Sequence, residues 1–210
     1  MTKQATDNPS PGLARRRAQL VMLALLFMAP VIAAWIVWLY VGDHGVGATT
    51  NAGQLVSPAQ ALPDDMPLQN LQGGPLDERA LRGRWTYVLF APPQGCDTGC
   101  RDWLFETRQL RVSINKDFPR VHRLLILPAA PAGETLGELS QANPDLQFAV
   151  AGGADLEQVR AVFEQAAPAD GSRVFLVDPL GNLMMTYGSD VGFKGMLKDL
   201  RKLLKVSQIG

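Results

Sequence analysis

The sequence predicts an α/β domain, a layered sheet with flanking helices, preceded by one N-terminal transmembrane helix. Three observations predict it. The run Ala18 to Val41 contains no charged residue and is long enough to span a bilayer. Beyond it, short apolar runs alternate with segments of helical periodicity, as in an α/β sheet. The only two cysteines, Cys96 and Cys100, lie between one such run and the next helical segment.

The overall composition fits one ordinary domain and a membrane segment. Hydrophobic residues make up 47% of the 210 residues, and the formal net charge is zero. A chain without net charge has no global field that recruits nucleic acid, so we expect no nucleic-acid partner.

The N-terminal part predicts a membrane anchor at 18–41. Residues 1–17 are mostly basic or polar and are expected to form a cytoplasmic tail. The cluster Arg15 to Arg17 favours the inside of the membrane, and aromatic residues at the far end form an interfacial belt: Trp35, Trp38 and Tyr40. The rest of the chain then lies in the periplasm of a bacterial inner membrane. A cleaved signal peptide is the alternative, but its apolar core is usually shorter, about 7 to 15 residues; a buried soluble helix is disfavoured because the run is apolar on every face.

Residues 42–61 lack an apolar period and predict a linker, in which His44 is a solvated residue. The compact domain is expected at 62–210, long enough for one hydrophobic core. Within it we expect two short strands around a turn at 66–76, followed by a helical turn at 77–83.

The apolar run Trp85–Phe90 predicts a buried strand in a central, parallel position, and Val121–Leu127 is expected to be the second buried strand. His122 lies at the start of the second strand, after Val121. The cysteines follow the end of the first, so His122 lies roughly 20 Å away at about 3.3 Å per residue and is a poor candidate ligand.

Three segments have the apolar spacing of amphipathic helices: 101–115, 155–165 and 193–205. A short strand is expected at 148–150, and a hairpin at 174–177 and 183–187. The order strand, cysteine turn, helix, strand, helix, hairpin, helix is that of the thioredoxin fold, whose chemistry lies where the first strand ends.

The last predicted helix carries a basic stripe: Lys194, Lys198, Arg201, Lys202 and Lys205. Such a stripe can touch anionic lipid or an acidic partner. A solvated face on a helix packed against the core is the favoured interpretation.

The spacing of Cys96 and Cys100 at a strand-to-helix turn places both sulfurs at the start of a helix, on one face. The N–H groups and dipole of a helix start favour thiolate. The pair can therefore act as a disulfide, a dithiol or a clamp for a soft metal. The alternative is a static bond, which would close a very short loop and stabilise the fold little.

Several of these features together resemble the Sco/SenC family. They are Leu81–Trp85 before an apolar strand, the Cys-x3-Cys turn, the hairpin segment Phe175–Gly181 and the basic last helix. The family consists of membrane-anchored, thioredoxin-fold copper proteins that help to assemble the dinuclear copper centre of cytochrome c oxidase. The resemblance covers about Leu62 to Lys205. It implies Cu(I) binding or thiol exchange at Cys96 and Cys100, with the copper-bearing oxidase subunit or another copper or thiol assembly protein as partner.

The chain departs from the family pattern at two places. The family generally has Cys-Pro-Asp-x-Cys-Pro, but here neither cysteine is followed by proline. The third copper ligand of the family is a histidine shortly before the hairpin, and by register Asp170 stands there. Two thiolates still suit Cu(I), which accepts soft ligands. A carboxylate oxygen of Asp170 would be a hard ligand in the place of the missing imidazole.

The sequence leaves three functions open. The chain is a Cu(I) carrier for oxidase assembly, a thiol-disulfide oxidoreductase without metal, or a non-catalytic scaffold that docks an assembly intermediate. A peroxiredoxin is disfavoured because no Pro-x3-Thr-x2-Cys pattern surrounds Cys96.

Overall fold

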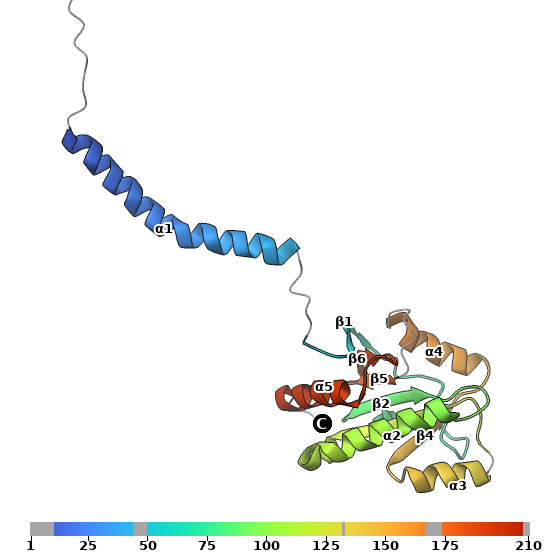
Figure 1. Cartoon of the computed structure of the whole chain (residues 1–210). Coiled ribbons are helices and arrows are strands. Elements are labelled where there is room, and N and C mark those ends of the chain that lie inside the picture. Colours follow the sequence, from blue (N-terminus) through green and yellow to red (C-terminus); the bar gives the residue numbers. More distant parts are fainter. Residues whose placement is uncertain (1–10, 44–49, 132, 167–173, 208–210) are drawn as a thin grey trace, which may run out of the picture. The chain divides into compact units, whose positions relative to one another are not determined.

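The structure is a computed structural model that describes most of the chain (Figure 1). The described ranges are 11–43, 50–131, 133–166 and 174–207. The contacts divide the chain into two compact units, residues 1–50 and 51–210, and each is described by itself. Residues 1–10 of the predicted tail, His44 of the predicted linker and Asp170 lie outside the described ranges.

The first unit contains one helix, α1 (Pro11–Asp43). By length and composition its segment Arg15–Val37 can cross a membrane, with a mean hydropathy of 2.7. Every side chain of this segment is exposed, so it is not the buried core helix of a soluble fold. The helix contains Pro30 and is bent (Figure 1). Because it begins at Pro11, residues 11–17 of the predicted tail are helical; the side chains of Trp38 and Tyr40 are not among those described.

The second unit is built on a six-stranded mixed sheet in the order β1-β6-β5-β2-β3-β4 (Figure 1). The strands are β1 (Gln54–Ala61), β2 (Trp85–Phe90), β3 (Val121–Leu127), β4 (Leu146–Val150), β5 (Val174–Val177) and β6 (Asn182–Tyr187). β3 runs parallel to β2 and β4, whereas β5 is antiparallel to β2 and β6. The two predicted central strands and the predicted hairpin are therefore confirmed.

Helices cover both faces of this sheet. On one face lie α2 (Thr98–Ser113), α3 (Gly133–Ala142) and α5 (Phe193–Val206), whose buried residues pack with Tyr87 and Leu125. On the other lies α4 (Ala154–Ala166), which packs Phe163 against Phe90 and Phe175. Two short 3-10 helices, η1 (Glu78–Ala80) and η2 (Asn115–Arg120), complete the domain. The predicted thioredoxin-like layering is confirmed.

The predicted linker at 42–61 is wrong for its last eight residues, because Gln54–Ala61 form β1 at the edge of the sheet. Gln54 pairs with Thr186, and Ala61 pairs with Asn182. Only Val56 of this strand is buried, so the segment has no apolar alternation. Backbone hydrogen bonds to β6 hold the strand, and these leave no trace in the hydrophobic pattern. The domain therefore begins at Asn51 and not at Leu62.

Two further features differ from the sequence analysis. Helix α3 was not predicted, because its apolar contacts come from Leu139 and the half-buried Leu136 alone, in a segment with two glycines. The two strands expected at 66–76 reduce to isolated bridges of Gln69 with Pro75 and with Val150.

The chain enters the domain beside α5. The carboxylate of Asp199, on α5, accepts hydrogen bonds from the backbone N–H groups of Ala52 and Gly53. Lys202 also donates to the side chain of Asn51, at 3.3 Å. These contacts, defined here as the entry clip, fix the first residues of the domain to its last helix.

Candidate redox and metal-binding site

Cys96 lies in the loop after β2, and Cys100 lies in the first turn of α2. The loop turns at Gly95, whose N–H donates to the carbonyl of Pro92 at 2.9 Å. Gly95 has a φ of +96°, a backbone conformation that residues with a Cβ atom rarely adopt. The turn reverses the chain directly after the strand and delivers Cys96 to the start of the helix.

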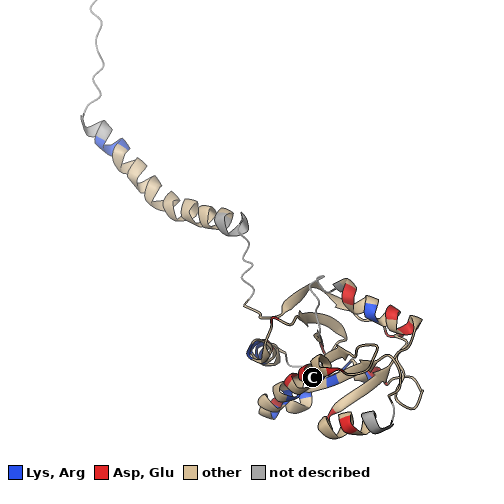
Figure 2. Ribbon diagram, turned by 45° about the vertical axis from the view of Figure 1, so that its right-hand side comes forward, with Lys and Arg blue, Asp and Glu red and all other residues tan. Residues whose placement is uncertain are grey.

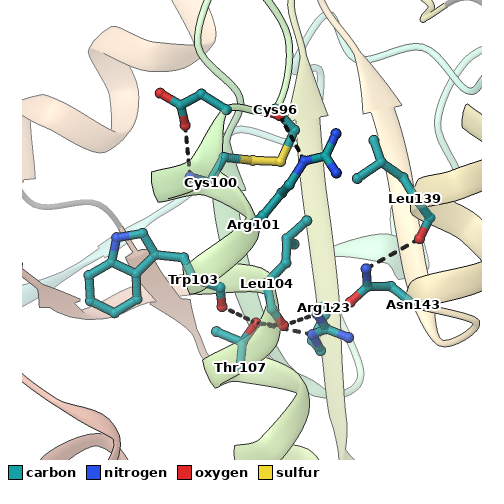
Figure 3. Close-up of a disulfide and its surroundings, with 10 residues drawn as sticks. Cys96, Cys100, Arg101, Trp103, Leu104, Thr107, Arg123, Leu139 and Asn143 are labelled. Atoms are coloured by element: carbon teal, nitrogen blue, oxygen red, sulfur yellow. Dashed lines mark hydrogen bonds between the residues drawn. A yellow bond between two sulfur atoms is a disulfide. The ribbon is translucent and has the colours of Figure 1, made fainter. Parts of the chain in front are cut away.

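The two cysteines form a disulfide, with Cα atoms 5.2 Å apart (Figure 3). The prediction that their spacing permits a bridge is confirmed. Cys100 is buried, with 8% of its surface exposed, whereas Cys96 is half-buried. A thiol or disulfide of another protein can therefore reach the sulfur of Cys96 more easily than that of Cys100.

The first turn of α2 surrounds the pair with opposing charges. Asp97 caps the helix, because its carboxylate accepts a hydrogen bond from the N–H of Cys100 at 2.8 Å. Arg101 donates from Nε to the carbonyl of Cys96 at 3.4 Å, which holds its guanidinium beside the disulfide (Figure 3). The helix dipole and Arg101 favour a thiolate here, and the carboxylate of Asp97 opposes it.

Beneath the pair, a buried arginine ties α2 to the sheet. Arg123, on β3, is fully buried. Its guanidinium donates to the Leu104 carbonyl, one helical turn after Cys100, and to Thr107 Oγ1 at 3.1 Å (Figure 3). It also binds the Asn143 side chain and forms an ion pair with Asp145 at 3.1 Å. Burial lowers the pKa of Arg123, and the Asp145 carboxylate opposes this shift.

The sequence analysis did not identify Arg101 or Arg123 as residues of the site. The position of Arg123 within the predicted buried strand Val121–Leu127 was a usable signal, because a buried cation needs several partners. The position of Arg101 carried a weaker signal, namely the replacement of a proline expected from the family pattern by a cation.

A groove of about 180 Å³ lies between α2 and α3, next to Arg101. Its lining includes Arg108, Leu139 and Phe105, whose side chain is 63% exposed. An exposed aromatic flanked by two cations beside a reactive pair is suited to hold a segment of a partner protein.

The structure places the other candidate residues apart from the pair. His122 pairs with Thr86 at the start of β2 and contacts Arg84, so it lies at the opposite end of the sheet, as predicted. Asp170 is outside the described residues, and β5 begins at Val174, opposite Leu89 near the cysteine end of β2. Among the described residues, no group of three or more His, Cys, Asp or Glu side chains can hold a metal ion.

This arrangement supports two kinds of chemistry. The pair can exchange two electrons with another dithiol or disulfide, using Cys96 as the accessible sulfur. In its reduced form it offers two soft sulfur ligands, which suit Cu(I).

Fold and site together define a thioredoxin-like domain with a redox-capable cysteine pair behind an apolar N-terminal helix. The chain belongs to the family described as transmembrane-like, thioredoxin-like, C-terminal domain, whose model matches residues 85–207. A search of curated proteins gave no match to the sequence.

Solved structures with similar folds include several Sco proteins. Copper-bound yeast Sco1 matches with a TM-score of 0.58 and 17% identity, over 72% of this chain and 96% of that one. Apo Sco1 from Thermus thermophilus matches with a TM-score of 0.56 and 19% identity, over 75% and 99%. BsSco, described as a Sco-family cytochrome c oxidase assembly protein with a disulfide switch, matches with a TM-score of 0.52 and 14% identity, over 73% and 100%. The resemblance to Sco/SenC proteins is confirmed in the fold.

Proposed function

We propose that this protein is a membrane-anchored, Sco-like assembly factor for the copper centre of cytochrome c oxidase, which acts by thiol-disulfide exchange through Cys96 and Cys100. The observation that carries the proposal is the bonded pair at the start of α2, with one sulfur half-buried and the other buried. The proposed site of action is the periplasmic side of a bacterial inner membrane, where disulfides persist unless a partner reduces them.

The proposed exchange begins with the reduced pair. The thiolate of Cys96 attacks a disulfide of the client, forms a mixed disulfide and releases one client thiolate. Cys100 then loses its proton and attacks the sulfur of Cys96, which releases the second client thiolate and closes the Cys96–Cys100 disulfide. The client gains two electrons and the pair loses two, so a dithiol protein must reduce the pair before the next cycle.

The copper-bearing oxidase subunit, or another copper or thiol assembly protein, is the proposed client. Thiolates bind copper and disulfides do not, so copper-ligating cysteines must be reduced before they are metallated. The groove with Arg101, Phe105 and Arg108 supports a peptide segment as the bound part of the client.

Trapping tests this function. In the full chain, Cys100→Ser removes the resolving thiol, so mixed disulfides with Cys96 should accumulate and be visible on non-reducing gels. Cys96→Ser is the matched control, because its remaining thiol is buried and should trap little. If Cys100→Ser traps no more partner protein than Cys96→Ser does, the proposal is overturned.

Cu(I) delivery is the second candidate function, with copper as cargo. It is supported by the match to Sco1 with copper bound and by the two sulfur ligands available after reduction. The described residues near the pair include no imidazole, which favours Cu(I) over Cu(II). Asp170 remains a proposed third ligand.

A competition titration of the reduced full chain in detergent against a chromophoric Cu(I) chelator tests this candidate. Stoichiometric binding that disappears in Cys96→Ser/Cys100→Ser would support delivery. Unchanged affinity in Asp170→Ala would remove that residue from the ligand set. If oxidase assembly persists in the double cysteine variant, the domain acts as a scaffold and both cysteine-based functions fail.

A further inference from the structure

The outer face of α5 is strongly basic. Its exposed members, defined here as the basic face, are Lys194, Lys198, Arg201, Lys202 and Lys205. At 100° per residue they occupy an arc of about 100°. Four of the six lysines of the chain lie on this helix. Figure 2 shows the contrast with α4, where acidic residues predominate.

No acidic side chain of α5 offsets this charge at the surface. The only acidic residue of the helix is Asp199, which is 1% exposed. Its carboxylate accepts hydrogen bonds from the N–H groups of Ala52 and Gly53. The ion pairs found among the described residues include none with Lys194, Lys198 or Lys205. Lys194, Lys198 and Lys205 therefore present their charge to whatever lies outside the domain.

The charge continues into a hollow of about 750 Å³ beside the last turns of α5. Lys116 and Arg120, from η2, line it together with Arg201 and Lys205. Its one acid, Asp117, is paired with Arg120 at 3.2 Å. A hollow of this charge and size fits a phosphate-bearing headgroup.

The entry clip places this face close to the point where the chain leaves the domain toward the apolar helix. The clip bonds Asn51, Ala52 and Gly53 to α5 itself. Only residues 44–50 separate the end of α1 from Asn51. Covalent geometry limits that stretch to about 30 Å at roughly 3.6 Å per residue.

We propose that the basic face of α5 docks on anionic phospholipid headgroups of the membrane in which α1 is anchored. This inference rests on the membrane anchor and not on the cysteine chemistry. Each basic residue near an anionic surface adds attraction, and the short connection keeps the face at high local concentration over the lipid. Docking would set the orientation of the domain on the bilayer.

The test uses the full chain reconstituted into nanodiscs, either of phosphatidylcholine alone or with added phosphatidylglycerol. The rates at which an amine reagent modifies Lys194 and Lys202 are measured by mass spectrometry. In anionic discs we expect both rates to fall by about threefold or more, because docking covers the amines. High salt should restore the rates, since it screens exposed charges beyond about 10 Å at 0.1 M and beyond about 3 Å at 1 M.

The variant Lys198→Gln/Lys205→Gln removes two exposed charges from the basic face and should abolish most of this protection. Arg79→Gln/Arg84→Gln is the matched control, because it removes two exposed charges, one in η1 and one directly before β2, and should leave the protection unchanged. Circular dichroism confirms folding of each variant. Equal modification rates in the two kinds of nanodisc would overturn the proposal. It would also be overturned if the control variant lost the protection of the lysine amines as much as Lys198→Gln/Lys205→Gln does.

Discussion

Asp199 and Gly53 join the two ends of the domain, because the buried carboxylate of Asp199 accepts the backbone N–H of Gly53 at 2.8 Å. The same carboxylate accepts the N–H of Ala52 at 2.9 Å. A carboxylate buried this deeply needs charge-assisted hydrogen bonds, and the first residues of the domain supply them.

Replacing Asp199 by alanine should lower the free energy of unfolding by about 2 kcal/mol, because two backbone donors lose a charged acceptor. Urea unfolding of the full chain in detergent, followed by fluorescence, measures it. The control Asp65→Ala removes an exposed carboxylate and should cost little. An equal loss in both variants would show that the clip contributes nothing specific.

Arg123→Met should lower the free energy of unfolding by about 3 kcal/mol, because the Leu104 carbonyl and the Asn143 side chain lose a buried charged donor, while Asp145 keeps only its ion pair with Arg111. Arg123→Lys should rescue only part of this loss, since an ammonium cannot reproduce the planar fork of contacts. Urea unfolding again provides the measurement, with exposed Arg79→Met as the control. Full rescue by lysine would mean that charge alone matters here.

Opening the disulfide should destabilise the domain moderately but leave it folded. The loop between Cys96 and Cys100 is so short that loop-closure entropy gives about 2 kcal/mol. We therefore expect the reduced protein and the double serine variant to unfold at similar denaturant concentrations, slightly below the oxidised protein. Unfolding of the domain on reduction would contradict this and would assign the bond a structural role.

Arg101→Gln should slow the alkylation of Cys96 at neutral pH by about threefold in the reduced protein, because a cation beside the sulfur stabilises thiolate. Iodoacetamide labelling followed by mass spectrometry reads the rate at each cysteine. Arg108→Gln, two turns further along α2, is the matched control and should leave the rate unchanged. A similar slowing in both variants would indicate a general field instead of a local contact.

His122 should make the domain less stable in mild acid. Burial lowers the pKa of His122, and Arg84 and Arg111 lower it further, while Asp145 acts in the opposite direction. Between this lowered pKa and the ordinary value near 6.5, the unfolded chain binds more protons than the folded one. Stability from this group is therefore present above about pH 6.5 and is lost as the pH falls through the folded pKa. The free energy of unfolding should decrease less between pH 7 and pH 5 in His122→Gln than in the unmodified protein, as urea titrations at both pH values would reveal.

The sequence predicts the features that depend on apolar pattern and spacing. The runs at Trp85–Phe90 and Val121–Leu127 form the buried strands, and the cysteine spacing permits the bond that forms. Features held by hydrogen bonds are missed: β1 buries only Val56, and the Arg123 network depends on partners far apart in the chain.

The role of Asp170 stays a prediction, because it depends on a register inferred from family resemblance. The direction of the domain across the membrane also stays a prediction. It follows from the basic cluster Arg15–Arg17 and the aromatic residues at the far end of the apolar run.

The entry clip also has a mechanical consequence. A pull on the chain from α1 reaches the domain first at the entry clip, so the load falls on Lys202 and Asp199 of α5 and on the pairing of β1 with β6. β6 and β5 stand between β1 and β2, the strand that leads to Cys96. Through the sheet, movement of the tether reaches Cys96 only across these strands, whereas α5 packs in the same core cluster as Cys100 of α2 and gives a shorter route to the disulfide.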